Sequence, residues 1–315
     1  MSLKIAIVNY QGSLKSALYG LEELFQMANL ACEEQGLSFQ FEPVIVDIDH
    51  KLRLEGVETN EQKQVFDIVI LPPSNSSDYY LEPGPSLVKW LQDQASLGAI
   101  LCSACAGAFI LAKTGVLNHR KITTHWGLAA AFIERFPELS LDTDKILINE
   151  SDVITAGGMM SWVDLGLELV GQYSQPSVMR QLGKMLVVDT GTREQRYYKQ
   201  FTPVYNHGDD LILKVQKWML QHVTQQITLL VLAEYCCLGE RTFLRRFKKA
   251  TGLNPTEYIQ HLRVQKVCEL LETSSNSFEW IVHQVGYEDA SACRKLFLRI
   301  MGLTPQEFRK RFVNA

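Results

Sequence analysis

The feature that most constrains this chain is a repeat of fifty residues near its C-terminal end. The matched positions, each pair fifty residues apart, are Phe247 and Phe297, Gly252 and Gly302, Pro255 and Pro305, and Tyr258 and Phe308. Self-similarity of this length marks a duplicated supersecondary unit. Two copies are too few for a solenoid, so we expect a pseudo-symmetric pair.

Each copy of the repeat has the pattern of two short helices joined by a tight turn. In the first copy, Leu232 and Ala233 belong to an apolar helix face, and a turn follows at Leu238-Gly239. The next helix places Phe243 and Phe247 on one buried face. A glycine then ends the helix, and a proline can begin the following one. In the second copy, the first helix contains Ile281, Val282 and Val285, and its turn follows at Gly286-Tyr287. This pattern predicts two helix-turn-helix units, whose second helices can enter a major groove.

The duplicated segment resembles the DNA-binding domain of the AraC family of transcription regulators, in which a linker helix joins two such units. The linker helix would span residues 256–272. Cys293 stands where the family usually has an aromatic residue, so either the core is looser there or Cys293 fills it as a small hydrophobic residue.

The second helix of each predicted unit carries the candidate DNA contacts. Those of the first helix-turn-helix are Arg241, Thr242, Arg245, Arg246 and Lys249. Those of the second are Ser291, Arg294, Lys295 and Arg299. Arginine can read guanine with two hydrogen bonds, whereas lysine more often holds phosphate. Arg246 and Lys249 are as easily explained as solvated surface charges.

Charge is divided unevenly along the chain. The net charge of −4 excludes a uniformly basic nucleic-acid binder. From Ile227 onward, however, there are 13 Lys and Arg against 9 Asp and Glu, whereas the preceding part has 18 against 26. Because phosphate contacts need local positive charge, an acidic body with a basic end favours a sensor joined to a DNA-binding domain.

The N-terminal end and the cysteines indicate the compartment. Residues 1–4 lead straight into an apolar strand without a cleavage pattern, and no apolar run reaches the roughly 18 residues of a membrane span. Seven cysteines at irregular spacing do not form a disulfide framework. We therefore expect a cytoplasmic protein without a membrane partner.

Residues 1–190 alternate strand and helix patterns. Strands are predicted at 3–8, 41–48, 65–71, 99–102, 145–148 and 153–156, and helices at 14–31, 87–97, 106–113 and 161–170. This alternation predicts an α/β domain with a flavodoxin-like, largely parallel sheet covered on both faces. A polar linker at 191–210 would follow, and then an all-α domain at 211–315 that begins with an amphipathic helix at 211–222.

A turn around Cys105 is the candidate ligand site of the first domain. The apolar strand 99–102 runs into small residues and then a helix, which would permit the sharp turn of a nucleophile elbow. Ligands of parallel sheets bind at the carboxyl ends of strands. At a helix N-terminus the dipole would lower the pKa of the thiol. Farther along the chain, the sequence Thr123-Thr124-His125-Trp126 supplies a histidine.

Together, Cys105-Ala106-Gly107 and Thr-Thr-His resemble the DJ-1/PfpI family, a branch of the class I glutamine amidotransferase-like fold. With the domain order, they resemble GlxA-like regulators, which fuse this fold to an AraC-type domain. The resemblance implies that Cys105 is the family's reactive cysteine and His125 its neighbouring histidine. The family's acid would fall near Ala17, and its peptidase members have histidine where this chain has Ala106. We therefore expect a ligand pocket without turnover, and no cofactor.

The pocket predicted from these motifs consists of Cys105, Ala106, Gly107, His125, Gly157 and Gly158. Gly157 and Gly158 precede a predicted helix, whose free N–H groups could bind an anion. The favoured hypothesis is a transcription regulator that binds double-stranded DNA and a small-molecule effector. The resemblance also implies a homodimer, with RNA polymerase as a further partner. The alternatives are a cysteine-dependent amide hydrolase or hydratase with a regulatory tail, and a redox sensor that uses Cys105.

Overall fold

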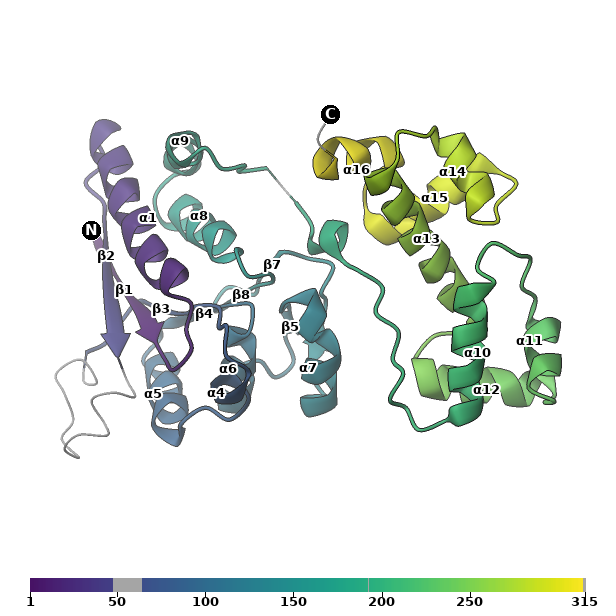
Figure 1. Ribbon diagram of the computed structural model, residues 1–315. Coiled ribbons are helices and arrows are strands. Elements are labelled where there is room, and N and C mark those ends of the chain that lie inside the picture. The colour runs from purple at the N-terminus through teal and green to yellow at the C-terminus, as the bar shows by residue number, and fades with distance from the viewer. Residues whose placement is uncertain (48–63, 192, 314–315) are drawn as a thin grey trace. The chain divides into compact units, whose positions relative to one another are not determined.

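The computed structural model describes residues 1–47, 64–191 and 193–313 (Figure 1). The chain divides into two compact units, residues 1–195 and 196–315, which we call the N-terminal and C-terminal domains. The division falls within the segment 191–210 that we predict as the linker. Residue 48 of the predicted strand 41–48 and residue 192 of the predicted linker lie outside the described residues. Among those described, none belongs to a helix with the length and apolarity that a membrane crossing requires.

The N-terminal domain is built on a six-stranded sheet with the order β2-β1-β3-β4-β8-β7. Its strands are β1 (Ser2–Asn9), β2 (Gln40–Asp47), β3 (Ile68–Leu71), β4 (Ile100–Ala104), β7 (Leu147–Asn149) and β8 (Val153–Ala156). All neighbours pair in parallel except β7, which runs antiparallel to β8 at the edge. Every residue of β3 and β8 is buried, as expected for strands covered on both faces. The predicted α/β class is confirmed.

Helices cover both faces of this sheet (Figure 1). On one face, α1 (Lys15–Glu34), α8 (Trp162–Tyr173) and α9 (Pro176–Leu186) pack on the alternate strand residues Leu3, Ile5 and Ile7. On the other, the residues Ala6 and Val8 pack with side chains of α4 (Ser77–Leu81), α5 (Pro85–Ser96), α6 (Gly107–Thr114) and α7 (Ala129–Arg135). The alternation along β1 therefore assigns its side chains to two separate cores.

Several short elements were not predicted from the sequence. They are α4, α7, α9 and a two-stranded parallel pair formed by β5 (Lys121–Ile122) and β6 (Ser140–Leu141). Two short 3-10 helices, η1 (Trp126–Leu128) and η2 (Gln195–Tyr198), were also missed. Apart from α9, which has 11 residues, these segments have two to seven residues and are too short for a period of 2 or 3.6 to emerge, so their position depends on tertiary contacts.

The C-terminal domain is entirely helical. Its helices are α10 (Asp210–Gln221), α11 (Leu229–Tyr235), α12 (Glu240–Thr251), α13 (Pro255–Thr273), α14 (Phe278–Gln284), α15 (Ala290–Met301) and α16 (Pro305–Phe312). One core joins α10, α11 and α12 to the start of α13, and a second joins the end of α13 to α14, α15 and α16. The predicted pair of helix-turn-helix units on one linker helix is therefore confirmed.

The local signals of the repeat appear in both copies. Gly252 and Gly302 end α12 and α15 in the left-handed conformation, with φ of 77° and 73°. Asn254 and Thr304 then form capping boxes at the starts of α13 and α16. These caps satisfy free backbone N–H groups of the next helix, so the same turn is built twice.

The turns inside the two helix-turn-helix units differ. Gly286 has a φ of 77° after α14, and the corresponding left-handed residue after α11 is Cys237, with a φ of 53°. The turn after α11 therefore lies at residues 236–237, two residues before the predicted Leu238-Gly239. A left-handed conformation strains a residue that has a Cβ, which makes Cys237 a local weak point of the first unit.

Candidate functional site

Cys105 occupies a sharp turn between β4 and α6. Its φ is +54°, and its backbone N–H donates a 2.8 Å hydrogen bond to the carbonyl oxygen of Ala156 on β8. A Cβ on Gly107 would lie 2.6 Å from the carbonyl oxygen of Leu71, so only glycine allows this close approach. The structure therefore has the strained strand-turn-helix geometry that the small residues predict.

The Cys105 thiol is nevertheless enclosed. The residue is 2% exposed, and burial raises its pKa to about 11, although a hydrogen bond with the backbone of Ala106 acts in the opposite direction. The backbone of Ala106 at the start of α6 lowers the pKa as predicted, but removing the thiolate from water has the larger effect, so the pKa is raised overall. At neutral pH the group is a thiol, which is a weak nucleophile.

The Thr-Thr-His segment is packed against the Cys105 turn. The hydroxyl of Thr124 donates a 2.7 Å hydrogen bond to the carbonyl oxygen of Cys105. The backbone N–H of Thr123 donates to the hydroxyl of Thr155 on β8 at 2.9 Å. Because both threonines are completely buried, these bonds fix the segment to the carboxyl ends of β4 and β8.

His125 caps a short helix. Its Nδ1 accepts a 3.0 Å hydrogen bond from the N–H of Gly127, and its ring stacks on Trp126 with centroids 5.3 Å apart. Partial burial lowers its pKa, so the neutral form is favoured. Among the hydrogen bonds of the described residues, none joins His125 to Cys105. Ala17, where the family's acid would fall, is fully buried and carries no carboxylate.

Gln195 is a residue of this region that sequence reasoning missed. Its side chain donates hydrogen bonds to the carbonyl oxygens of Thr124 at 3.0 Å and Lys145 at 3.2 Å, and accepts one from the N–H of Trp126 at 2.7 Å. A Cβ on Gly157 would clash with the Gln195 amide and would lie 2.7 Å from the Thr124 carbonyl. Gly157 is thus explained by close packing, and Gly158, with a φ of 96°, by the turn before α8.

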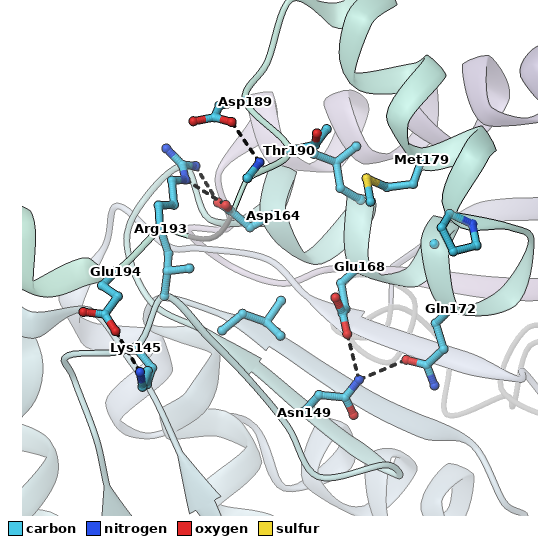
Figure 2. Close-up of a pocket in the computed structure, with 16 residues that line it drawn as sticks. Lys145, Asn149, Asp164, Glu168, Gln172, Met179, Asp189, Thr190, Arg193 and Glu194 are labelled. Carbon is cyan, nitrogen blue, oxygen red and sulfur yellow. Dashed lines mark hydrogen bonds and ion pairs between the residues drawn. The ribbon is translucent and has the colours of Figure 1, made fainter. Parts of the chain in front are cut away.

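A separate cavity of about 670 Å³ lies beside the segment that leaves the N-terminal domain (Figure 2). It is lined by residues of β7 and the two residues before it, of α8, of the start of α9, and by residues 189–191 and 193–194. Arg193 forms a bidentate ion pair with Asp164 at 2.9 and 2.6 Å, and Lys145 pairs with Glu194 at 2.8 Å. The sequence did not indicate this cavity, because its walls come from segments without a shared motif.

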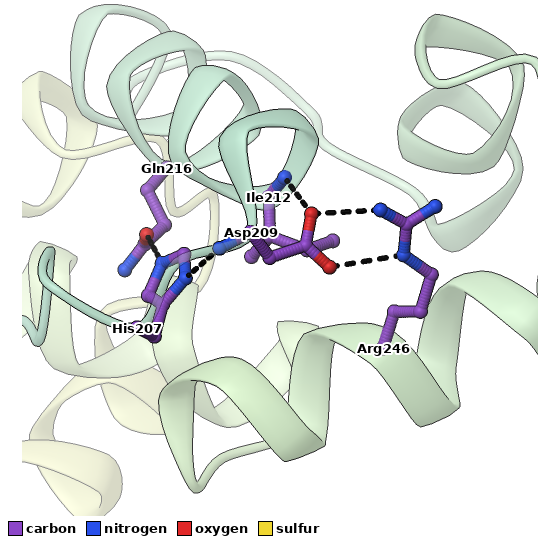
Figure 3. Close-up of polar contacts among 5 residues, drawn as sticks. All are labelled: His207, Asp209, Ile212, Gln216 and Arg246. Carbon is purple, nitrogen blue, oxygen red and sulfur yellow. Dashed lines mark hydrogen bonds and ion pairs between the residues drawn. The ribbon is translucent and has the colours of Figure 1, made fainter.

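The predicted DNA contacts of the first helix-turn-helix fall into two groups. Arg241, Thr242, Arg245 and Lys249 are exposed on α12. Arg246 instead donates hydrogen bonds to both carboxylate oxygens of Asp209, at 2.9 and 2.8 Å (Figure 3). The Arg246 side chain is thus occupied within the C-terminal domain, so its presence on α12 has a structural explanation without DNA.

The predicted contacts of the second helix-turn-helix, Ser291, Arg294, Lys295 and Arg299, are all exposed on α15. Two of these residues also have partners within the domain. The Arg294 guanidinium lies 5.1 Å from the centre of the Phe278 ring and 3.4 Å from a carboxylate oxygen of Glu279. Arg299 donates a 3.0 Å hydrogen bond to Gln260. Cys293 is fully buried, so it fills the core as a small hydrophobic residue.

The chain is similar to known proteins over both domains. It matches the DJ-1/PfpI family over residues 23–172 and a helix-turn-helix domain family over residues 232–311. It is 27% identical over 226 residues to the HTH-type transcriptional regulator CdhR of Pseudomonas aeruginosa, a match that covers 71% of this chain and 67% of that protein. It is 23% identical over 230 residues to the HTH-type transcriptional regulator GlxA of Rhizobium meliloti. That match covers 70% of this chain and 68% of GlxA. The match to the HTH-type transcriptional regulator GbdR of Pseudomonas aeruginosa covers 61% of that protein's length.

A solved structure supports the fold of the N-terminal domain. A protein from Vibrio parahaemolyticus, proposed to be a transcriptional regulator, matches 59% of this chain and 100% of its own with a TM-score of 0.50 at 22% identity. At this identity the likeness shows the fold alone. The two family matches, in this order along the chain, show that it belongs to the AraC-type helix-turn-helix transcriptional regulators that carry an N-terminal DJ-1/PfpI domain.

Proposed function

We propose that this chain regulates transcription by reading a promoter sequence with its C-terminal domain while its N-terminal domain binds a small metabolite. The observation that carries the proposal is the duplicated helix-turn-helix, in which α12 and α15 both present exposed basic side chains. Two such helices on one linker helix fit successive major-groove faces, about 34 Å apart. A metabolite that favours one state of the N-terminal domain would shift the population that binds DNA.

The chemistry around Cys105 supports binding rather than turnover. A cysteine nucleophile needs a base that activates it and a third group that orients that base. Here the thiol is buried with a raised pKa, the Nδ1 of His125 is engaged by Gly127, and Ala17 replaces the family's acid. The redox alternative is disfavoured by the same burial, because oxidants react with exposed thiolates. Cys105, Ala106, Gly107, His125, Gly157 and Gly158 remain the proposed effector pocket.

Gln195 supports a route from this pocket to the DNA-binding domain. It is the last residue of the N-terminal domain, and its side chain holds the Thr-Thr-His segment beside Cys105. An effector that displaces Thr124 would also break hydrogen bonds of Gln195, and thereby change the restraint on the chain that enters the C-terminal domain. The cavity bordered by Arg193 and Glu194 adjoins the same exit, which makes it a second place where an effector would act.

We further propose that the protein acts in the cytoplasm as a homodimer and that the DNA-bound form contacts RNA polymerase. These proposals follow from the family, whose relatives CdhR and GlxA are described as transcriptional regulators. A dimer would double the number of recognition helices on one operator, and symmetric assembly is the common arrangement of soluble oligomers.

The proposal is tested by incubating the purified full-length protein with fragmented genomic DNA and sequencing the fragments that it retains. We expect a recurrent motif that disappears in the double variant Arg241→Ala/Arg245→Ala. The matched control is Arg180→Ala, which removes an exposed arginine from α9 of the N-terminal domain and should leave the motif intact. Uniform recovery of fragments by the wild-type protein would overturn the proposal. Genes beside the retained sites then indicate metabolites to test as effectors by thermal stabilisation.

A further inference from the structure

We infer that the two helix-turn-helix units read different bases: α12 reads guanine through Arg241 and Arg245, whereas α15 reads thymine through Ala292 and Leu298. The operator is then asymmetric, with a guanine-containing half and a thymine-containing half. This inference rests on the proposed DNA-binding function and assigns chemistry to each half of its site.

The two recognition helices can be compared position by position. Both contain twelve residues, both begin after an N-cap (Gly239 or Asp289), and both end at a left-handed glycine. Each residue of α12 therefore has a counterpart fifty positions later in α15. Residues in the N-terminal part of a recognition helix contact base edges, and exposed side chains one turn farther along the same face extend that contact.

In α12, the exposed residues among these positions include two arginines. Arg241 and Arg245 lie one turn apart on the same side of the helix, with Thr242 beside them. Among the contacts of the described residues, neither guanidinium has an ion-pair partner, whereas the neighbouring Arg246 is held by Asp209. Free guanidinium groups at these positions match the two acceptors, O6 and N7, that guanine presents in the major groove.

In α15, the same positions carry no arginine with a free guanidinium. The counterparts of Arg241, Thr242 and Arg245 are Ser291, Ala292 and Lys295. The one arginine in this part, Arg294, corresponds to Leu244 and lies against Phe278 and Glu279. This exposed ion pair is weak, but Arg294 stands at the position of Leu244, so α15 has no arginine where α12 has Arg241 and Arg245.

Apolar side chains on the exposed surface of α15 supply a different contact. Ala292 is exposed where α12 has Thr242, and Leu298 is 45% exposed where α12 has Lys248. A single exposed leucine is common on protein surfaces, but here it replaces a lysine on the helix face that also carries Ser291 and Lys295. Thymine differs from cytosine in the major groove by its methyl group, which apolar side chains recognise.

The charges on the two helices also support different roles for α12 and α15. The C-terminal half of α12 exposes Lys248 and Lys249, whereas the matching residues of α15 are Leu298 and Arg299, and Arg299 is bonded to Gln260. Helix α12 therefore contributes more of the phosphate neutralisation than α15, which makes its binding sensitive to salt. Helix α15 contributes more through base contacts that salt does not weaken.

The inference is tested by selecting duplexes from a random library with the full-length protein and then replacing single bases in the selected duplex. Replacing a guanine by 7-deazaguanine removes N7, and we expect binding to weaken on the order of 10-fold for the wild type but not for Arg245→Ala. Replacing a thymine by uracil removes only the methyl group, and we expect a loss of about 3- to 5-fold for the wild type but not for Ala292→Gly or Leu298→Ser. Circular dichroism checks that each variant keeps its helices.

The outcomes separate this inference from the proposed function. If α12 variants abolish the effect of 7-deazaguanine in one half of the duplex and α15 variants abolish the effect of uracil in the other, the inference holds. If guanines are selected in both halves, or if uracil has no effect, the inference is overturned while DNA reading stands. If the library yields no preferred sequence over a random duplex, the proposed function itself fails.

Discussion

The guanidinium of Arg246 on α12 donates two hydrogen bonds, of 2.9 and 2.8 Å, to the carboxylate of Asp209 at the start of α10 (Figure 3). The same carboxylate accepts a 3.2 Å hydrogen bond from the N–H of Ile212, so Asp209 is also the N-cap of α10. One side chain thus fixes the first helix of the C-terminal domain to the first recognition helix.

Replacing Asp209 should loosen this junction. We expect Asp209→Ala to cost about 1 kcal/mol through the lost N-cap, with a smaller contribution from the partly exposed ion pair. Hydrogen–deuterium exchange of the full-length protein should show faster exchange in peptides of α10 and α12 and unchanged exchange in the N-terminal domain. The control is Asp210→Asn, which removes the adjacent exposed carboxylate. Equal effects of the two variants would contradict the assigned role.

The left-handed residues after α11 and α14, Cys237 and Gly286, give two stability predictions of opposite sign. Cys237→Gly should stabilise the C-terminal domain by about 0.5–1 kcal/mol, because relief of left-handed strain exceeds the entropy cost of glycine. Gly286→Ala should destabilise it, because the new Cβ would clash with the carbonyl oxygen of Thr224. Scanning calorimetry of the full chain checks both changes. A Cys237→Gly variant that melts earlier would show that the turn is not strained.

Two glycine-to-alanine variants test the packing around Gln195: Gly157→Ala changes it, and Gly171→Ala is the control. In Gly157→Ala the new methyl group would collide with the Gln195 amide, so we expect a loss of about 1–3 kcal/mol in the N-terminal domain. Gly171 lies in α8 with its nearest neighbour, Met179, at an ordinary 3.5 Å, so Gly171→Ala should be neutral or slightly stabilising. Urea unfolding measures both. If Gly157→Ala is as stable as wild type, Gln195 does not hold the segment as described.

Thiol labelling tests the chemistry of Cys105. Because burial raises its pKa to about 11, roughly one thiol in a thousand is ionised at pH 8, and the labelling rate should rise with pH until it approaches that value. Mass spectrometry of the folded protein treated with iodoacetamide at pH 8 should find Cys237 modified, since it is exposed, and Cys105 unmodified. All seven cysteines should react in urea. Rapid labelling of Cys105 in the folded state would revive the redox and enzyme alternatives.

The sequence contained most of the fold because its strongest signals are local. The fifty-residue repeat, the helix-ending glycines and the prolines that follow them are short-range features, and the structure realises each one in both copies. The sheet was predictable because β1, β3 and β4 are apolar runs of strand length. Pairing order and the antiparallel β7 depend on contacts between distant segments, which periodicity does not encode.

The site was less predictable, because it too depends on contacts between segments that are distant in the sequence. The elbow at Cys105 follows from small residues in a row, but the pKa of its thiol depends on how tightly other elements enclose it. Gln195 lies in a polar stretch with no motif, and its partners at Thr124 and Lys145 are 71 and 50 residues away. Arg246 was grouped with the other arginines of α12, and only the position of Asp209 separates it from them.

The most direct test of the account is the ratio of dissociation constants for a selected duplex and a scrambled duplex of equal length, measured with the full-length protein by fluorescence anisotropy at physiological salt. Sequence-specific regulators bind their sites about 10³-fold or more tightly than other DNA, and the account predicts a ratio of that order. It also predicts that Arg241→Ala/Arg245→Ala brings the ratio close to 1. A wild-type ratio near 1 would contradict the account.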